Sequence, residues 1–366
     1  MELEDTDRDG DLDLWVSRGT LNGTGRTSQF WRNDGTGTFR LPKSGGAGES
    51  LDRTDTIFGD LDGDTDRDLV EGVNLGPEKA RFNSGTGSFA PRKTGGLRDS
   101  TTDVTISITL FDADGDGDLD IIEANECPPP VCTDGGAQNT LWINNGQGTF
   151  TDETLPRLPA RLDQTSGIIA GDIDGDGDKD LVVVNGSTAG AQSFILVNDG
   201  SGHFTDQTGL RLPAQLLSGR DGALVDIDGD GDRDLLIVVS RQRQSQLFLN
   251  NGLGFFTNVT ANLPVQNASF QEVEVIDTNA DGVVDFFYLS DTGATIDGIN
   301  HIFAGAQNRL WENDGIGHFT DITAAHLPAV IDQSLSAAIG DVNGDGKFDI
   351  VVGNGKGEPI KLYLQQ

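Results

Sequence analysis

Nine residues, from Asp172 to Asp180, place five aspartates at alternating positions in the sequence Asp-Ile-Asp-Gly-Asp-Gly-Asp-Lys-Asp. At a spacing of ~5 Å and an effective dielectric of ~20, each adjacent pair of carboxylates would repel by roughly 3 kcal/mol, so a cation is expected among them. Side-chain oxygens at positions 1, 3, 5 and 9, a main-chain carbonyl at position 7 and a turn glycine form a cage for a hard cation. Its flexible carboxylates suit Ca²⁺ better than Mg²⁺. The segment therefore predicts a calcium-binding loop.

The same nine-residue frame occurs seven times, at spacings of 55, 52, 60, 54, 51 and 64 residues. A period near 50 residues is typical of a repeat architecture. With position 7 contributing its carbonyl, the predicted ligand positions are Asp5, Asp7, Asp9, Asp11 and Asp13; Asp60, Asp62, Asp64, Asp66 and Asp68; Asp112, Asp114, Asp116, Asp118 and Asp120; Asp172, Asp174, Asp176, Asp178 and Asp180; Asp226, Asp228, Asp230, Asp232 and Asp234; Asp277, Asn279, Asp281, Val283 and Asp285; and Asp341, Asn343, Asp345, Lys347 and Asp349. The chain is predicted to hold up to seven Ca²⁺ ions.

The copies differ at positions that affect binding. In the second loop Thr65 replaces the turn glycine, so this loop is expected to bind less well. In the sixth and seventh loops Asn279 and Asn343 keep an oxygen but remove one charge. We expect these two sites to be weaker or more selective.

The composition is strongly acidic. Lys and Arg number 25 against 59 Asp and Glu, giving a net charge of -34, and the loops hold 31 of the aspartates. Seven Ca²⁺ ions would bring the charge only to about -20, which argues against nucleic acid and anionic membranes as partners. No apolar run approaches the ~18 residues of a membrane span. We expect neither nucleic-acid binding nor membrane insertion.

Strand signals surround each loop. A short apolar stretch precedes the loop, as in residues 167–171, and a β-branched run follows it, as in residues 235–239. A second strand pair surrounds a recurrent glycine turn, as in residues 198–204 and 313–319. Each repeat thus reads as four antiparallel strands, A-loop-B and then C-turn-D. Seven such units predict an all-β fold over residues 1–366, a single seven-bladed β-propeller with calcium-binding A–B loops.

The repeat resembles a known family. The order strand, Gly-Asp-x-Asp-Gly-Asp-Gly-x-x-Asp-Leu, strand, and then Leu-x-x-Asn-Asp-Gly-x-Gly-x-Phe-x-Asp-x-Thr is similar to the FG-GAP/VCBS repeat of integrin α-subunit propellers and bacterial surface proteins. Residues 308–323 especially resemble the cartilage-acidic-protein (ASPIC/UnbV-associated) group. The resemblance covers essentially the whole chain. It implies a propeller, whose fold supports adhesion, lectin and a few lyase activities.

Two other interpretations of the acidic loops are weaker. An EF-hand needs a carboxylate at position 12, where five of the loops have Val16, Val183, Ile237, Tyr288 or Val352. A solvated acidic turn would not retain aspartate at positions 1, 5 and 9 in all seven copies. The metal-binding interpretation is therefore preferred.

The connectivity predicts two faces. A–B loops and C–D turns lie on one face, and the variable B–C insertions (17–28, 125–139, 186–192 and 291–308) lie on the other. Loops on a rigid scaffold commonly bind ligands. We expect a protein or glycan ligand on the face opposite the calcium loops.

The two cysteines, Cys127 and Cys132, lie within one insertion. A small disulfide-closed loop fits an oxidising compartment; free thiols or a two-thiolate metal site are the alternatives. The chain is expected to be extracellular, at the cell surface or periplasmic.

Catalytic motifs are sparse, and no catalytic residue is predicted. The four histidines are scattered; His203 and His318 occupy variable turn positions. The sequence favours a calcium-binding adhesion or binding module. A lectin-like propeller, and less favourably a polysaccharide lyase or hydrolase, are the alternatives.

Counting strands gives a further expectation about the ring. By this count the sequence begins inside the first A–B loop and ends at the C–D turn of blade 7, so strand A of blade 1 and strand D of blade 7 are expected to be missing. An exposed sheet edge invites aggregation. We therefore expect the natural protein to extend at both ends, with a signal peptide and strand A before Met1 and at least one strand after Gln366.

Overall fold

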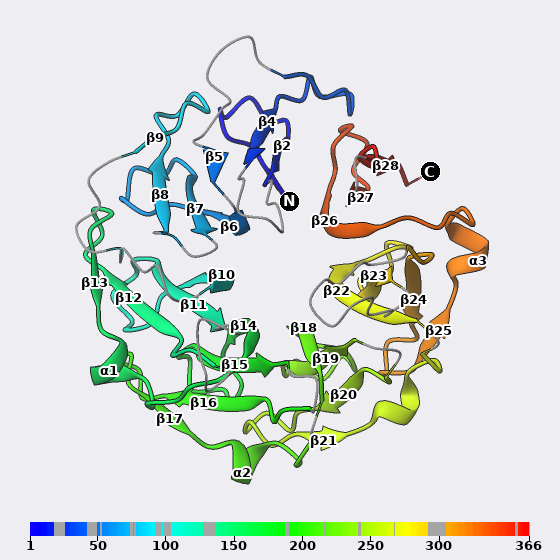
Figure 1. Ribbon diagram of the computed structural model, residues 1–366. Coiled ribbons are helices and arrows are strands. Elements are labelled where there is room, and N and C mark those ends of the chain that lie inside the picture. The colour runs from blue at the N-terminus through cyan, green and yellow to red at the C-terminus, as the bar shows by residue number, and fades with distance from the viewer. Residues whose placement is uncertain are drawn as a thin grey trace.

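The computed structural model describes residues 1–17, 26–41, 50–51, 53–73, 76, 78–91, 97, 104–126, 136–186, 190–215, 217–240, 243–266, 268–291, 305–355 and 358–365. Within these residues the chain forms seven small antiparallel sheets arranged in a ring, as Figure 1 shows. This confirms the predicted seven-bladed β-propeller.

The blades follow one another along the chain. Blade 1 contains β1 (Glu2–Glu4), β2 (Asp13–Val16) and β4 (Gln29–Trp31); blade 2 contains β6 (Arg53–Gly59), β7 (Asp68–Val73), β8 (Lys79–Phe82) and β9 (Ala90–Pro91); blade 3 contains β10 (Val104–Phe111), β11 (Asp120–Glu126), β12 (Thr140–Asn144) and β13 (Phe150–Asp152); blade 4 contains β14 (Thr165–Gly171), β15 (Asp180–Asn185), β16 (Phe194–Asn198) and β17 (Phe204–Asp206). Blade 5 contains β18 (Gly219–Val225), β19 (Asp234–Val239), β20 (Gln246–Leu249) and β21 (Thr257–Asn258); blade 6 contains β22 (Ser269–Ile276), β23 (Asp285–Asp291), β24 (Arg309–Asn313) and β25 (Phe319–Asp321); blade 7 contains β26 (Ser334–Gly340), β27 (Asp349–Asn354) and β28 (Lys361–Tyr363). A separate two-stranded sheet pairs β3 (Arg26–Thr27) with β5 (Ser50–Leu51).

The second strand of each blade is sandwiched between neighbouring blades. Every residue of β7, β15 and β19 is buried, which explains why these strands lack the polar alternation of a half-exposed strand. The A strands surround the centre of the ring, and the D strands lie at its periphery (Figure 1). The ends of strands A and B therefore project the nine-residue loops onto one face of the ring.

The hydrophobic core lies between the blades. The described residues form seven clusters of buried side chains, and each cluster contains residues of two adjacent blades. The cluster between blades 7 and 1, for example, contains Leu14, Val16, Val342 and Val351. Apolar contacts thus close the ring between the first and last blades.

The structure corrects one expectation about the ends. Glu2–Glu4 forms β1 and pairs with β2 as strand A of blade 1, so that strand is present but only three residues long. The sequence Glu-Leu-Glu did not predict this strand, because a single apolar residue gives no strand signal. Blade 7 has three strands among the described residues, as expected.

Short helices were not predicted. α1 (Thr154–Arg157), α2 (Thr208–Arg211) and α3 (Thr323–His326), with the 3-10 helix η1 (Thr260–Asn262), each follow a D strand. Each begins at a threonine, and these one-turn elements are too short to give a helical period. They turn the chain from the rim of the ring toward the next A strand.

Candidate metal centres

The first aspartate of each loop bends the backbone around its own carboxylate. In blade 3 Asp112 accepts hydrogen bonds from the main-chain N–H groups of Gly115 (2.8 Å) and Gly117 (3.0 Å). In blade 4 the carboxylate of Asp172 likewise accepts hydrogen bonds from the main-chain N–H groups of Gly175 and Gly177. These bonds wrap positions 1 to 6 into a tight ring of main-chain amides.

That wrapping requires a left-handed backbone at two positions. Position 6 has φ of 92° at Gly117, and Thr65 adopts 72° there despite its branched Cβ. Position 4 is also left-handed in all seven loops, including Arg8 and Ala280. The sequence contained the signal for position 4, since five loops have glycine there, but the prediction used only position 6.

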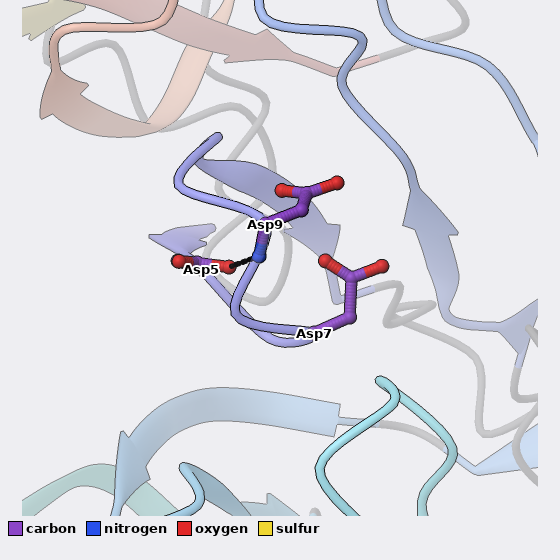
Figure 2. Close-up of side chains that lie close together, drawn as sticks. All are labelled: Asp5, Asp7 and Asp9. Atoms are coloured by element: carbon purple, nitrogen blue, oxygen red, sulfur yellow. Dashed lines mark hydrogen bonds between the residues drawn. The ribbon is translucent and has the colours of Figure 1, made fainter.

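Carboxylate oxygens converge inside the wrapped loops. In three loops, one oxygen each from positions 1, 3 and 9 lie within 4.8 Å of one another; in two loops the oxygens come from positions 1, 3 and 5. Figure 2 shows one such group, Asp5, Asp7 and Asp9, with the main-chain N–H of Asp9 bonded to Asp5 (3.2 Å). The five groups are Asp5, Asp7 and Asp9; Asp60, Asp62 and Asp68; Asp112, Asp114 and Asp120; Asp172, Asp174 and Asp180; and Asp226, Asp228 and Asp230. Several acidic clusters could therefore bind metal ions.

Buried oxygens at position 3 make the best case for a cation. One carboxylate oxygen, Oδ1, of each of Asp7, Asp114, Asp174 and Asp228 is buried and accepts no hydrogen bond from the described residues. A buried carboxylate oxygen without a partner is costly, and a cation would remove that cost. An all-oxygen donor set fits Ca²⁺, with positions 1, 3, 5 and 9 and the position-7 carbonyl as the residues that would hold it.

The position-7 side chains do not join these groups. A Cβ added at Gly146 would lie 2.3 Å from the Asp118 carboxylate, and one at Gly200 would lie 2.4 Å from the Asp178 carboxylate. The side chains of Asp118 and Asp178 therefore lie against the C–D turn of their own blade. Only the carbonyl remains for a metal, which is why Val283 and Lys347 can occupy this position.

Position 9 connects each loop to the C–D turn. Asp120 accepts from the main-chain N–H of Ala113 at position 2 (2.8 Å) and from that of Asn144 at the turn (2.8 Å). The turn bond recurs in every blade, from Asn33 to Asp13, Asn83 to Asp68, Asn198 to Asp180, Asn250 to Asp234, Asn313 to Asp285 and Gln365 to Asp349. Loops and turns thus share one face, as predicted.

Burial dominates the electrostatics of position 9. It raises the pKa of Asp120 to about 7 and those of Asp68, Asp180 and Asp234 to about 6, although the main-chain N–H donors act in the opposite direction. A bound cation would favour the ionised form. Metal binding would therefore be coupled to deprotonation of position 9.

A side-chain amide ties each loop to the next blade. Asn144 in blade 3 donates through Nδ2 to the carbonyl of Leu61 (2.8 Å), which is position 2 of the loop in blade 2. The same bond runs from Asn83 to Thr6, Asn198 to Ala113, Asn250 to Ile173, Asn313 to Ile227, Gln365 to Thr278 and Asn33 to Val342. Sequence reasoning assigned this asparagine only a turn role.

Arginines provide further links that the sequence did not suggest. Arg211 in α2 lies 2.9 Å from the position-3 carboxylate of Asp174 and donates to the carbonyl of Leu253 in the next C–D turn (2.7 Å). Arg157 in α1 lies 3.4 Å from the Asp114 carboxylate and donates to Ser201 (2.6 Å). These guanidinium groups balance part of the loop charge and hold one of its carboxylates in place.

The asparagine-containing loops are arranged differently. Asn279 and Asn343 each accept a hydrogen bond from the main-chain N–H two residues later, at 2.9 Å. Their Nδ2 groups donate to Glu312 (3.1 Å) and Asp345 (3.3 Å), respectively. Each loop therefore has an amide donor where the other five have a second carboxylate oxygen.

The predicted ligand face is described only in part. The B–C insertions lie mostly outside the described residues, and so does the predicted Cys127–Cys132 bridge. Within the described part of the chain, none of the helices has the length and apolar character needed to cross a membrane. His203 and His318 lie in C–D turns, where Ser201 and Asp314 are their neighbours.

The antiparallel sheets, their arrangement in a ring and the aspartate-rich loop in each blade together define a β-propeller built from sequence repeats. The FG-GAP-like repeat family matches residues 5–71, 131–183, 173–237, 226–288 and 297–352. The chain belongs to this family.

Named relatives are consistent with this assignment. The chain is 26% identical to Cartilage acidic protein 1 of Xenopus tropicalis over 289 residues, which is 72% of this chain and 42% of that protein. It is 28% identical to the Mus musculus protein of the same name over 293 residues, with the same two shares. The chain thus spans about two fifths of the length of these relatives.

Solved structures share the fold. An Agrocybe aegerita lectin, described for specific recognition of non-reducing terminal N-acetylglucosamine, aligns with a TM-score of 0.56 at 20% identity, over 94% of this chain and 89% of that one. The BP39L lectin from Burkholderia pseudomallei aligns with a TM-score of 0.54 at 11% identity, over 95% and 94%. A protein from Lactobacillus plantarum aligns with a TM-score of 0.60 at 12% identity, over 97% and 92%.

Proposed function

We propose that this protein is an extracellular β-propeller, stabilised by Ca²⁺ in its A–B loops, that serves as a non-catalytic binding or adhesion module. The supporting observation is the buried Oδ1 at position 3 in four loops, which has no hydrogen-bond partner among the described residues and lies beside further carboxylate oxygens. Oxygen-only loops with flexible carboxylates favour Ca²⁺. The ion is abundant outside cells, and the relatives are named after cartilage, a tissue rich in extracellular matrix.

Calcium would act on the scaffold rather than on a substrate. Each loop is hydrogen-bonded to the next blade through its position-2 carbonyl, so ordering the loop also fixes the blade interface. A rigid ring then presents the loops of the opposite face to a ligand, as rigid scaffolds do in other binding proteins. The ligand of this proposal is a protein or a glycan.

Ion stoichiometry tests the metal part. Native mass spectrometry of the calcium-loaded chain should show up to seven bound ions. The double variant Asp114→Ala, Asp174→Ala should lose two ions, while Asp199→Ala, in an exposed C–D turn, should lose none. Full retention of calcium by the double variant would contradict these sites.

Ligand arrays test the binding part. The labelled protein is applied to matrix-protein and glycan arrays either in about 2 mM calcium or with excess chelator. The calcium concentration is on the order of that outside cells. We expect saturable binding to one class that chelation abolishes. Binding to neither class would contradict a binding module, and equal binding with chelator would contradict the role of calcium.

A glycan ligand is the second candidate, because two of the solved structures with this fold are lectins. That likeness is one of fold at low identity, so it favours a class of ligand and no particular sugar. Competition by free N-acetylglucosamine on the glycan array distinguishes a terminal-sugar site from a protein-binding surface. Inhibition is expected only for the lectin alternative.

A further inference from the structure

Three blades place an arginine in the same niche on the face of the calcium loops. This guanidinium niche lies between the position-3 carboxylate of one blade and the carbonyl of the fourth residue of the C–D turn in the next blade. Arg211 fills it between blades 4 and 5, where it donates to Asp174 (2.9 Å) and to the carbonyl of Leu253 (2.7 Å). The corresponding sets are Arg157 with Asp114 and Ser201, and Arg32 with Asp7 and Thr86.

Between blades 5 and 6 the niche has both acceptors but no arginine. Asp228 is position 3 of the loop in blade 5, and Ile316 is the fourth residue of the C–D turn in blade 6. Among the described residues the Oδ1 atom of Asp228 has no hydrogen-bond partner, and the charges of Asp226 and Asp230 beside it are negative. A carboxylate that other blades pair with a guanidinium is therefore available to another cation.

The connection after the D strand explains why blade 5 differs. Arg157 ends α1 and Arg211 ends α2, each directly before a leucine, whereas Asn262 ends η1 before Leu263. The 3-10 helix η1 has three residues where α1 and α2 have four. Asn262 is neutral and shorter than arginine, and among the described residues no hydrogen bond joins its side chain to Asp228. Blade 5 thus supplies no guanidinium of its own at this place.

The space that a guanidinium takes in the other blades is open here. A Cβ added to Gly254, in the turn of blade 5, would collide with the guanidinium of Arg211. At Gly317, the equivalent glycine of blade 6, the closest described atoms would belong to Ile227 (3.6 Å) and Asp228 (3.7 Å). These are ordinary van der Waals distances. No described side chain therefore blocks this niche.

Exposure of the niche indicates what kind of ligand fits. Ile316 is 63% exposed, so the niche opens directly to the surface. His318 stands where blade 5 has Phe255, whose ring centre lies 5.4 Å from the Arg211 guanidinium. Such an open site holds the end of a side chain but does not enclose a small molecule. The net charge of -34 also favours a partner with basic side chains.

We propose that this niche, formed by the Asp228 carboxylate, the Ile316 carbonyl and the ring of His318, binds an arginine side chain of a partner polypeptide. The carboxylate and the carbonyl would accept from its guanidinium, as their counterparts accept from Arg211. Arginine fits better than lysine, because its planar fork donates to two acceptors at once. The contact lies on the face of the calcium loops, so it goes beyond the ligand of the proposed function and requires no bound ion.

A short peptide tests the proposal. The probe is Thr-Gly-Leu-Arg, the sequence of residues 208–211, acetylated and amidated, and in its control peptide citrulline, which is uncharged and similar in shape, replaces the arginine. Each peptide is titrated into the ¹⁵N-labelled full chain in saturating calcium and about 0.15 M salt, which screens distant charges. We expect the amide signals of Gly229 and residues 315–317 to shift saturably. Citrulline should weaken binding at least about tenfold, because it removes the charge-assisted hydrogen bonds.

Variants of the chain locate the site. Asp228→Asn should weaken binding about tenfold or more, whereas Asp174→Asn should leave it unchanged, because that carboxylate is already paired with Arg211. A graft that replaces residues 260–262 with Thr-Gly-Leu-Arg spares every loop aspartate and supplies the arginine within the chain. It should abolish peptide binding, while the same graft ending in glutamine should retain it. Cooperative melting of all four variants establishes that they are folded.

The proposal is overturned if the arginine peptide does not bind, if the citrulline peptide binds as tightly, if the shifts fall on other loops, or if the arginine graft still binds the peptide. Free L-arginine that binds as tightly as the peptide would also overturn it, since a small guanidinium compound would then be the ligand. These outcomes are independent of the array test, which concerns the opposite face.

Discussion

The side-chain amide of Asn33 donates a 2.8 Å hydrogen bond to the main-chain carbonyl of Val342, although 309 positions separate the two residues. Asn33 begins the C–D turn of blade 1, and Val342 is position 2 of the loop in blade 7. The bond between them repeats the one that joins consecutive blades elsewhere, such as that between Asn198 and Ala113 (2.8 Å). The first and last blades are thus joined by the same contact that joins neighbours in sequence.

Loss of this amide should weaken the closed ring. Asn33→Ala would leave the buried carbonyl of Val342 without its donor, which costs about 1–3 kcal/mol. We expect a loss of that size in the free energy of urea unfolding, and a similar loss for Asn198→Ala within the ring. If Asn198→Ala is destabilising and Asn33→Ala is not, the bond between blades 1 and 7 contributes nothing to ring stability.

Calcium should raise the melting temperature markedly. With an extracellular-type dissociation constant of ~10⁻⁴ M and ~1 mM ion, each site adds roughly 1.4 kcal/mol, and seven sites in one cooperative ring would add about 10 kcal/mol. Scanning calorimetry with calcium and with excess chelator measures the difference. Identical melting in both conditions would show that the ions are not structural, and magnesium at the same concentration is the control for ionic strength.

The loops should differ in affinity. Complete aspartate loops, at Asp112, Asp172 and Asp226, are expected to fill before those containing Thr65, Asn279 or Asn343. Accordingly, titration calorimetry should find a larger loss of calcium affinity for Asp174→Ala than for Asn343→Ala. The reverse order would contradict this ranking of the loops.

The recurrent pattern predicted the fold and placed the loops, because a strand signal that is weak in one repeat recurs at the same position in the others. It failed at Glu2–Glu4, where one leucine between two glutamates still pairs with β2, since tertiary pairing overrides a weak local signal. It also could not show that Asn144 reaches Leu61 or that Arg211 reaches Asp174. These contacts depend on which blade lies beside which loop, and no spacing within one repeat contains that information.

Substitution of Thr65 should measure the cost of the left-handed backbone in the second loop. Its φ of 72° is left-handed, which costs a residue with a Cβ roughly 1–2 kcal/mol relative to glycine. Thr65→Gly should therefore raise the free energy of unfolding by about 1 kcal/mol, and Gly177→Thr, at the same position of the fourth loop, should lower it by a similar amount. Urea unfolding in saturating calcium measures both. The hydroxyl of Thr65 accepts from Arg8 (2.5 Å), so Arg8→Lys on each background controls for that contact.

Carboxylates gather on the A strands around the centre of the ring, and they should make stability depend on pH. Burial, with repulsion from Glu272, raises the pKa of Asp221 to about 7, against the effect of the Val273 N–H that donates to it (2.9 Å). Burial likewise raises the pKa of Glu2 to about 8. Protonated Asp221 is thus favoured by folding, and its stabilising contribution, fully present below pH 4, is lost as the pH rises through about 7.

Asp221→Asn should remove that dependence, because the amide oxygen still accepts from Val273 and carries no charge. We expect the variant to gain stability relative to the wild type between pH 5 and pH 8, measured by urea unfolding in saturating calcium. Asp314→Asn is the control: its exposed turn carboxylate has a pKa lowered by the N–H of His318, so no gain at pH 8 is expected. An Asp221→Asn variant no more stable than the wild type at pH 8 would show that this carboxylate is ionised at no cost in the folded ring.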